Sequence, residues 1–130
     1  MAQSNRRQWF DDYIAALNRD DLEAVAVFYA PDLHMTDGTA ECQSARAAME
    51  NHRCFRGSVV QRLEVLTYID RPGRIAAEIR KTEQALRDVP DFPGAPLTKG
   101  EQRASIGFVM YDIADGCFIR IRAAPYKAAP

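Results

Sequence analysis

Cysteine is scarce in this sequence, and the few cysteines form no recognisable pattern. Cys42, Cys54 and Cys117 are odd in number and widely spaced, without a CxxC pair or a Cys/His cluster. Disulfide frameworks and structural zinc sites need such residues at close and regular spacing. We therefore expect three free thiols and no metal site. Because no phosphate-binding glycine loop, GxSxG nucleophile or dinucleotide motif is present, we expect no cofactor either.

Long apolar runs and clusters of positive charge are also lacking. No stretch approaches the roughly 18 apolar residues of a membrane span, and the segment MAQSNRRQWF lacks the apolar core of a signal peptide. The net charge is -1, and Arg6, Arg7, Arg120 and Arg122 are scattered rather than gathered in a patch. The sequence therefore predicts a cytoplasmic protein that binds neither nucleic acid nor membrane.

The sequence does contain enough apolar material for one folded domain. Its 130 residues are 47% hydrophobic and 27% charged, and no repeat, linker or low-complexity tract divides them. A chain of this length can bury about two thirds of its unfolded surface in one core. We therefore expect a single domain that spans residues 1–130.

Helical patterns fill the first half of the chain. Between Gln8 and Asn18 the apolar side chains recur at i, i+1, i+4, i+5 and i+8, which is one stripe of a helix. Asp20, with an acid three residues later, resembles a capping box and predicts a second helix that ends at Pro31. Ser44 predicts the cap of a third helix, which stops at Gly57.

After this third helix the pattern changes to that of strands. Four segments are rich in Val, Ile, Thr and aromatic residues that partly alternate: Val59–Asp70, Arg74–Leu86, Gln102–Asp112 and Cys117–Ala124. Their tight connections predict antiparallel pairing, and Gly107 predicts a bulge or a bend. Helices followed by such a sheet form an α+β layout, with the helices on one sheet face. We expect the proline-rich loop Asp88–Thr98 to border the mouth of a pocket.

Two parts of the sequence resemble a known superfamily. They are Tyr13–Asp37, which reads YIAALNRDDLEAVAVFYAPDLHMTD, and the ending, in which FPGAPLTKG, a strand and ADGCFIRIRA follow one another. Both are similar to the nuclear transport factor 2-like superfamily, most closely to SnoaL-like polyketide cyclases and steroid delta-isomerases (ketosteroid isomerases). The resemblance implies a cone-shaped cystatin-like α+β barrel, with three N-terminal helices on a strongly bent antiparallel sheet. It also implies an internal pocket for a small molecule, and a homodimer built on the exposed face of the long strands.

Asp37 is the first candidate for chemistry. It follows a short strand-like segment and shares the parity of Leu33 and Met35, so a strand continued to this point would aim its carboxylate inward. An inward carboxylate in an apolar hollow suits general-base work. The position resembles that of the base in steroid delta-isomerase. The alternative is a solvated turn formed by Asp37 and Gly38.

Tyr13 is the second candidate, because it lies on the apolar stripe of the first helix. Its position resembles that of the tyrosine that binds the dienolate oxygen in the isomerases, and the alternative is a core tyrosine bonded to a backbone carbonyl. The isomerases also carry an acid on the third long strand, whereas this sequence offers Gly107, Phe108 or Val109. None of these side chains can donate a hydrogen bond, which disfavours steroid isomerisation itself.

Further side chains are candidates for the walls of the pocket. They are six apolar or aromatic residues and one histidine: Trp9, Met35, His52, Phe55, Tyr68, Phe108 and Met110. Such residues are also common in an ordinary core or at its boundary. His34 has the opposite strand parity to Asp37, and we expect it to face away from the pocket.

Together these features predict a domain that binds a small, mostly apolar organic molecule. One hypothesis is an isomerase, cyclase or dehydratase in which Asp37 removes a proton next to a carbonyl and Tyr13 binds the developing oxyanion. A second is a non-catalytic ligand-binding or dimerisation module that kept the pocket and lost part of the catalytic residues. A third is hydrolysis of a small epoxide, for which Asp37 would have to activate water beside another acid and an arginine.

Overall fold

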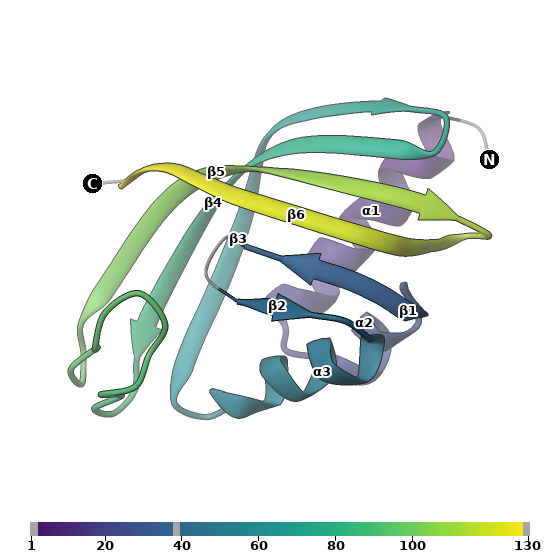
Figure 1. Cartoon of the computed structure of the whole chain (residues 1–130). Helices are drawn as coiled ribbons and strands as arrows, with labels where there is room; N and C mark the ends of the chain where they lie inside the picture. Colours follow the sequence, from purple (N-terminus) through teal and green to yellow (C-terminus); the bar gives the residue numbers. More distant parts are fainter. Residues whose placement is uncertain (1–2, 38–39, 129–130) are drawn as a thin grey trace.

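The computed structural model describes residues 3–37 and 40–128, which form three helices and six strands (Figure 1). The helices are α1 (Gln3–Asn18), α2 (Leu22–Ala26) and α3 (Ala45–Cys54). The strands are β1 (Tyr29–Thr36), β2 (Glu41–Cys42), β3 (Val59–Arg71), β4 (Arg74–Ala85), β5 (Gln102–Ala114) and β6 (Cys117–Ala128). The predicted α+β class and the four long C-terminal strands are both present.

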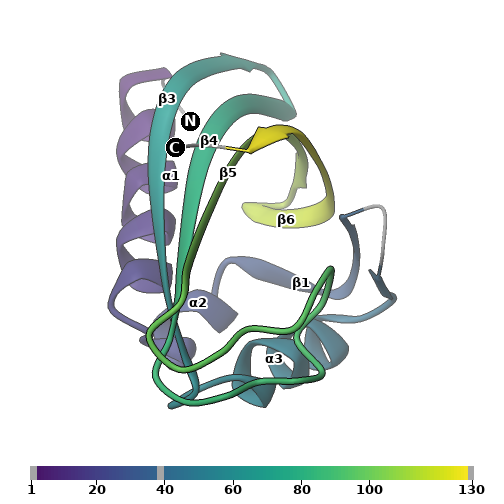
Figure 2. The ribbon, with the colours of Figure 1, turned by 90° about the vertical axis from the view of Figure 1, so that its left-hand side faces the viewer.

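The strands form one curved sheet in the order β2-β1-β6-β5-β4-β3. Figure 2 shows the sheet curling from β3, beside α1, round to β1, with α2 and α3 near its lower edge. The four long strands pair antiparallel, as predicted, whereas β1 pairs parallel with β6. The sheet is therefore mixed rather than purely antiparallel. The helices are not one N-terminal block, because β1 and β2 separate α2 from α3.

The second helix is shorter than the sequence pattern predicts. Its cap is Asp21, whose carboxylate accepts a hydrogen bond from the Ala24 backbone N–H at 3.1 Å. Asp20 instead adopts a left-handed φ of 57° and lies before the helix. Pro31 does not end the helix but lies inside β1, where the pairing with β6 is irregular. A proline is tolerated there because a break in the ladder needs no backbone donor.

The predicted cap and bulge are both confirmed. The Ser44 hydroxyl accepts a hydrogen bond from the Ala47 N–H at 3.0 Å and starts α3. The β5–β6 register shifts at Gly107. A Cβ atom at this glycine would lie 2.7 Å from the Ala124 carbonyl oxygen and 2.8 Å from Pro125 Cα. The close approach of β6 therefore requires a residue without a side chain at this position.

Two hydrophobic clusters hold the helices against the concave face of the sheet. The main cluster contains most of the buried side chains, including six aromatic rings: Phe10, Tyr13, Phe28, Tyr29, Tyr111 and Phe118. The smaller cluster lies at the end of the sheet where the β4–β5 loop is found, and consists of Ala85, Val89 and Leu97, with Phe55, Val59 and Phe92 packed against it.

A side-chain amide ties α1 to the edge strand β3. The Asn18 Nδ2 group donates to the Leu63 carbonyl at 2.9 Å, and its Oδ1 atom accepts from the Leu63 N–H at 2.7 Å. The amide thus binds both backbone groups of one edge residue, as a neighbouring strand would. Edge strands with unpaired backbone groups invite wrong pairing, so this contact also protects the edge.

Candidate functional site

A chain of hydrogen bonds crosses the main cluster from α1 to α3. The hydroxyl oxygens of Tyr13 and Tyr29 are 2.8 Å apart, and the Tyr29 hydroxyl lies 3.1 Å from His52 Nε2. Tyr13 is 3% exposed and Tyr29 is 5% exposed, while His52 is half-buried. The imidazole also stacks on the Tyr29 ring, with centroids 6.2 Å apart. Residues from α1, β1 and α3 therefore form one polar network inside an apolar core.

The members of this network are electrically neutral near pH 7. Burial raises the pKa of Tyr13 well above its ordinary value and also raises that of Tyr29. Burial lowers the pKa of His52, and the nearby Asp20 charge opposes this only in part. The cluster therefore offers hydroxyl and imidazole groups without net charge, which suits an uncharged polar atom of a ligand.

The direction of these hydrogen bonds depends on the His52 tautomer. With the proton on Nε2, the bonds run from His52 through Tyr29 to Tyr13, and the Tyr13 hydroxyl can donate to a further acceptor. With the proton on Nδ1, the bonds run the other way, and the Tyr13 oxygen can accept instead. The same three side chains can therefore serve either a donor or an acceptor on a ligand.

Tyr111 joins this cluster, although sequence reasoning missed it. It is 3% exposed, and its ring lies edge-on to Tyr13 with centroids 6.3 Å apart. Among the described residues, its hydroxyl has no hydrogen-bond partner. Its register partners are Ile75 and Ile121, which are both buried on the inner face. Strand alternation could have identified it. Tyr111 lies two residues after Val109 and four after Gly107, so all three side-chain positions belong to the same face of β5.

Asp37 lies outside the aromatic cluster. β1 ends at Thr36, and the exposed Asp37 carboxylate accepts a hydrogen bond from the Ala40 N–H at 2.9 Å. This is the arrangement of a solvated turn, although Gly38, the other residue of the predicted turn, lies outside the described residues. The Asp37 charge adds to burial in raising the pKa of Cys42, the register partner of Met35. The carboxylate is therefore at the rim of the inner face rather than within it.

Four of the predicted wall residues contact the hydrophobic clusters. Trp9, Met35 and Tyr68 pack against the main cluster, and Phe55 packs against the smaller one. The Tyr68 hydroxyl is already engaged, because it donates to Asp70 at 2.6 Å. The structure thus brings these residues to the same side of the sheet as Tyr13.

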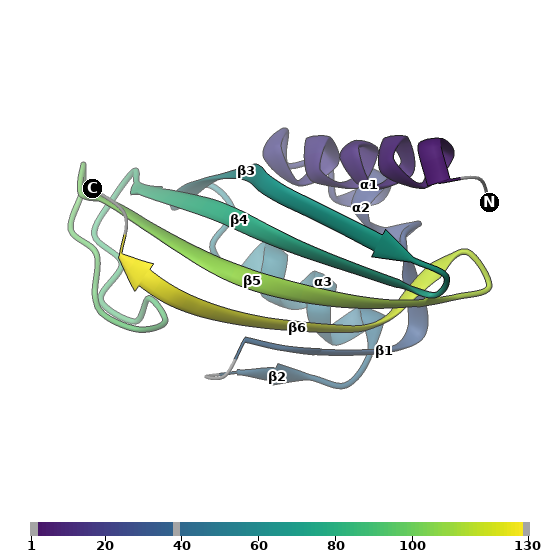
Figure 3. The same cartoon turned by 90° about the horizontal axis from the view of Figure 1, so that it is seen from above.

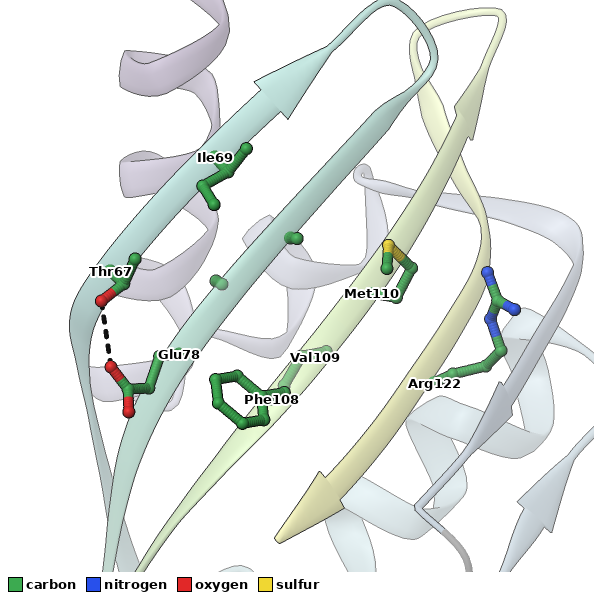
Figure 4. A pocket seen from close by; sticks show the side chains of 9 residues that line it. Thr67, Ile69, Glu78, Phe108, Val109, Met110 and Arg122 are labelled. Carbon is green, nitrogen blue, oxygen red and sulfur yellow. Dashed lines mark hydrogen bonds between the residues drawn. The ribbon is translucent and has the colours of Figure 1, made fainter. Parts of the chain in front are cut away.

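Phe108 and Met110 lie on the opposite face of the sheet. Figure 4 shows them in front of the strands, with the helices behind. They line a concavity of ≈ 370 Å³, whose other lining residues are Thr67, Ile69, Ala76, Ala77, Glu78, Val109 and Arg122. Phe108 is 56% exposed and stacks on Tyr126 with centroids 4.7 Å apart. The thickness of the sheet therefore separates these two side chains from Tyr13, because adjacent residues of a strand point to opposite faces.

The cysteines and the acidic residues form no metal-binding cluster in the described part of the chain. Cys42, Cys54 and Cys117 are all free thiols, as predicted. Within residues 3–37 and 40–128, no three His, Cys, Asp or Glu side chains are grouped so that they could hold a metal ion. No helix in these ranges is both long enough and apolar enough to cross a membrane.

Comparisons with solved structures identify the fold. No protein-family model and no curated protein matches the sequence. A polyketide cyclase-like protein from Xanthomonas campestris pv. campestris matches at a TM-score of 0.75 and 21% identity, over 91% of this chain and 87% of that chain. An LEH-like epoxide hydrolase from M. tuberculosis matches at a TM-score of 0.75 and 12% identity, over 92% and 80%. A ketosteroid isomerase-like protein from Kribbella flavida matches at a TM-score of 0.71 and 15% identity, over 95% and 79%.

Identities this low establish a fold and not an activity, because one fold can carry many unrelated sites. The three proteins differ in the activity for which they are named, but each superposes on nine tenths or more of this chain. The chain therefore has the fold shared by polyketide cyclase-like, ketosteroid isomerase-like and epoxide hydrolase-like proteins, which is the fold that the sequence resemblance implied.

Proposed function

We propose that this domain binds a small, mostly apolar organic molecule with a carbonyl or phenolic oxygen, in an internal pocket of a cone formed by the helices and the concave sheet face. The observation that carries the proposal is the group of neutral hydroxyls of Tyr13, Tyr29 and Tyr111 within an aromatic cluster. Hydroxyl groups inside an apolar cluster are stabilised by polar partners, and a ligand oxygen would provide such a partner.

The way into this pocket would lie between the two hydrophobic clusters. There β4 carries Lys81 and Glu83. They lie two and four residues after the buried Ile79, so they are on the same inner face of the strand. Their side chains are 40% and 13% exposed and lie 4.0 Å apart. Charged groups on a concave face keep that stretch hydrated, so apolar packing does not close it. The loop Asp88–Thr98 lies at the same end of the sheet and would border the opening (Figure 3).

Ligand binding without chemistry is the first form of the proposal, because the Asp37 carboxylate is exposed and engaged in its own turn. An isomerase, cyclase or dehydratase is the second form. It is favoured by the position of Asp37 directly after β1, the strand whose Tyr29 and Met35 side chains contact the main cluster. In this form, Asp37 would move inward, take the proton next to a carbonyl, and leave Tyr13 and Tyr111 to bind the oxyanion.

A titration with 2-naphthol, a planar phenol, would test the binding proposal. Tyr13→Phe and Tyr111→Phe should each weaken binding by about fivefold, since one hydrogen bond to a buried ligand is worth about 1 kcal/mol. Tyr126→Phe is the matched control, because Tyr126 lies on the outer face. Equal affinity in all three variants, or no binding by the wild-type protein, would overturn the proposal.

The catalytic form needs a separate measurement. Small cyclic ketones would be incubated with the protein in D₂O, and deuterium uptake next to the carbonyl would be followed by NMR. A base within the site should accelerate this exchange, and Asp37→Asn should abolish the acceleration while 2-naphthol still binds. Exchange that is no faster with the wild-type protein than with the variant would leave ligand binding as the function.

We further propose that the domain forms a homodimer through the outer face of its long strands. This face carries three exposed apolar side chains around the concavity at Phe108, namely Ile69 at 63%, Phe108 at 56% and Tyr126 at 46%. Ion pairs of Asp112 with Arg74 and with Arg122 lie on the same face. An apolar centre with a polar rim is typical of a surface that binds another protein.

A further inference from the structure

A second concavity lies at the end of the sheet away from the β4–β5 loop. Figure 3 shows the start of α1 together with the β3–β4 and β5–β6 turns at this end. The two turns are joined by a hydrogen bond from the Ile113 N–H to the Gly73 carbonyl at 2.9 Å. Between them and α1 is a space of ≈ 340 Å³, lined by Arg6, Trp9, Gly73, Ile113, Ala114, Asp115 and Gly116.

Arg6 is the unusual member of this lining. Its Nε and Nη1 atoms are buried, and neither has a hydrogen-bond partner among the described residues. A guanidinium that loses water without gaining a partner is unfavourable, and it is therefore rare in folded proteins. Its neighbour Arg7 is satisfied, because Arg7 pairs with Asp11 at 3.0 Å and lies 4.5 Å over the Tyr68 ring. Arg122 also has a buried Nε atom without a partner, but its Nη2 atom pairs with Asp112 at 3.3 Å. Arg6 lines a space large enough for a ligand, and no ion pair with a described residue neutralises its guanidinium.

The lining specifies the chemistry of that ligand. A guanidinium binds carboxylates and phosphates best, because its planar donors match their oxygens. Asp115 lines the same space, and its negative charge would repel a dianion such as phosphate more strongly than a monoanion. Trp9, Ile113 and Ala114 supply apolar surface for a hydrocarbon body. These features together favour an organic monocarboxylate.

We propose that this concavity binds a small organic monocarboxylate, with Arg6 as the group that holds the carboxylate and Trp9 as a wall for the apolar part. The site is separate from the tyrosine cluster, since none of the three hydroxyl-bearing tyrosines there contributes to its lining. The proposal for this site can therefore be tested independently of the function proposed for the tyrosine cluster.

The test uses benzoate as the probe and benzamide as its uncharged counterpart, with the full chain at constant ionic strength. Benzoate should shift the NMR signals of the Trp9 indole and the Gly116 amide, while benzamide should not. Arg6→Gln should weaken benzoate binding by at least tenfold, whereas Arg7→Gln should change it by less than twofold. If benzoate instead shifts the signals of Tyr13 and Tyr111 and leaves those of Trp9 unchanged, it binds elsewhere and the proposal is wrong.

Thermal unfolding gives a second readout that does not depend on knowing the affinity. Benzoate should raise the midpoint of the wild-type protein, and Arg6→Gln should lose that increase while being at least as stable as the wild type without benzoate. A variant that is less stable in the absence of benzoate, with no benzoate effect on the wild type, would mean that Arg6 has only a structural role. Phosphate bound as tightly as benzoate would contradict the assignment to a monocarboxylate.

Discussion

The hydroxyl oxygens of Tyr13 and Tyr29 lie 2.8 Å apart in the core, although 16 positions separate the two residues. This contact fixes α1 against β1 and connects Tyr13 to His52. Tyr13→Phe should lower the free energy of unfolding by about 1 kcal/mol, because it removes one buried hydrogen bond and leaves Tyr29 bonded to His52. Urea unfolding would measure the change. Tyr111→Phe is the control and should change stability less, since the Tyr111 hydroxyl has no partner among the described residues.

His52 should make stability depend on pH on the acid side of neutrality. Burial lowers its pKa below the ordinary value of 6.5, so the unfolded chain binds this proton more readily than the folded one. Its contribution to stability should be complete above pH 6.5 and be lost as the pH falls through the lowered pKa of the folded state. Unfolding free energies of the wild type and His52→Gln between about pH 5 and pH 8 would check this. Parallel curves for the two proteins would contradict it.

Asn18 should contribute to the stability of the edge of the sheet. Asn18→Ala leaves both the N–H and the carbonyl of Leu63 without their partner, which should cost about 1–3 kcal/mol. Gln8→Ala on the same helix is a matched control, because the Gln8 bond to Asp12 is exposed and should contribute less than about 0.5 kcal/mol. Similar losses in both variants would mean that the amide does not support β3.

Gly107→Ala should be destabilising although alanine is a small residue. The added Cβ would meet backbone atoms of Ala124 and Pro125 at less than 3 Å, and a backbone cannot move aside as a side-chain end can. The expected loss is roughly 1–3 kcal/mol, the usual cost of overpacking. Differential scanning calorimetry would measure it. An unchanged transition would show that β6 can shift at this bulge.

The dimer proposal predicts that a charge on the outer face separates the subunits. Light scattering at micromolar concentration should give twice the chain mass for the wild type and a monomer mass for Ile69→Glu, with unchanged circular dichroism. Val27→Glu is the control, because Val27 is 70% exposed but belongs to the end of α2 rather than to this face. A monomer mass for the wild-type protein would reject the dimer.

Local sequence patterns predicted most helices and strands well, because the start and end of a helix or strand depend mainly on neighbouring residues. The Ser44 cap, the change from helical to strand period after α3 and the glycine at the bulge each follow from the backbone needs of a few adjacent positions. The same kind of reasoning misplaced the start and end of α2, since Asp20 and Asp21 are equally good caps in sequence. Only the packing of Leu22 and Val25 against the main cluster decides between them.

The faces of the strands were less predictable than their existence. Phe108 and Tyr111 are three residues apart on one strand, so strand parity places them on opposite faces but does not decide which of the two is inside. The β4–β5 register decides this, because Tyr111 pairs with the buried Ile75 and Phe108 with Glu78. A shift of one residue in register would exchange the two faces.

By itself the sequence determined the fold class, the four antiparallel strands and the presence of a tyrosine on the apolar side of α1. The tertiary structure alone decided that β1 joins β6 in parallel and that Tyr13 meets Tyr29 and His52. The physical reason is the range of the interactions involved. Periodicity, caps and turns are set by residues a few positions apart, whereas these contacts join distant positions that only the folded, curved sheet brings together.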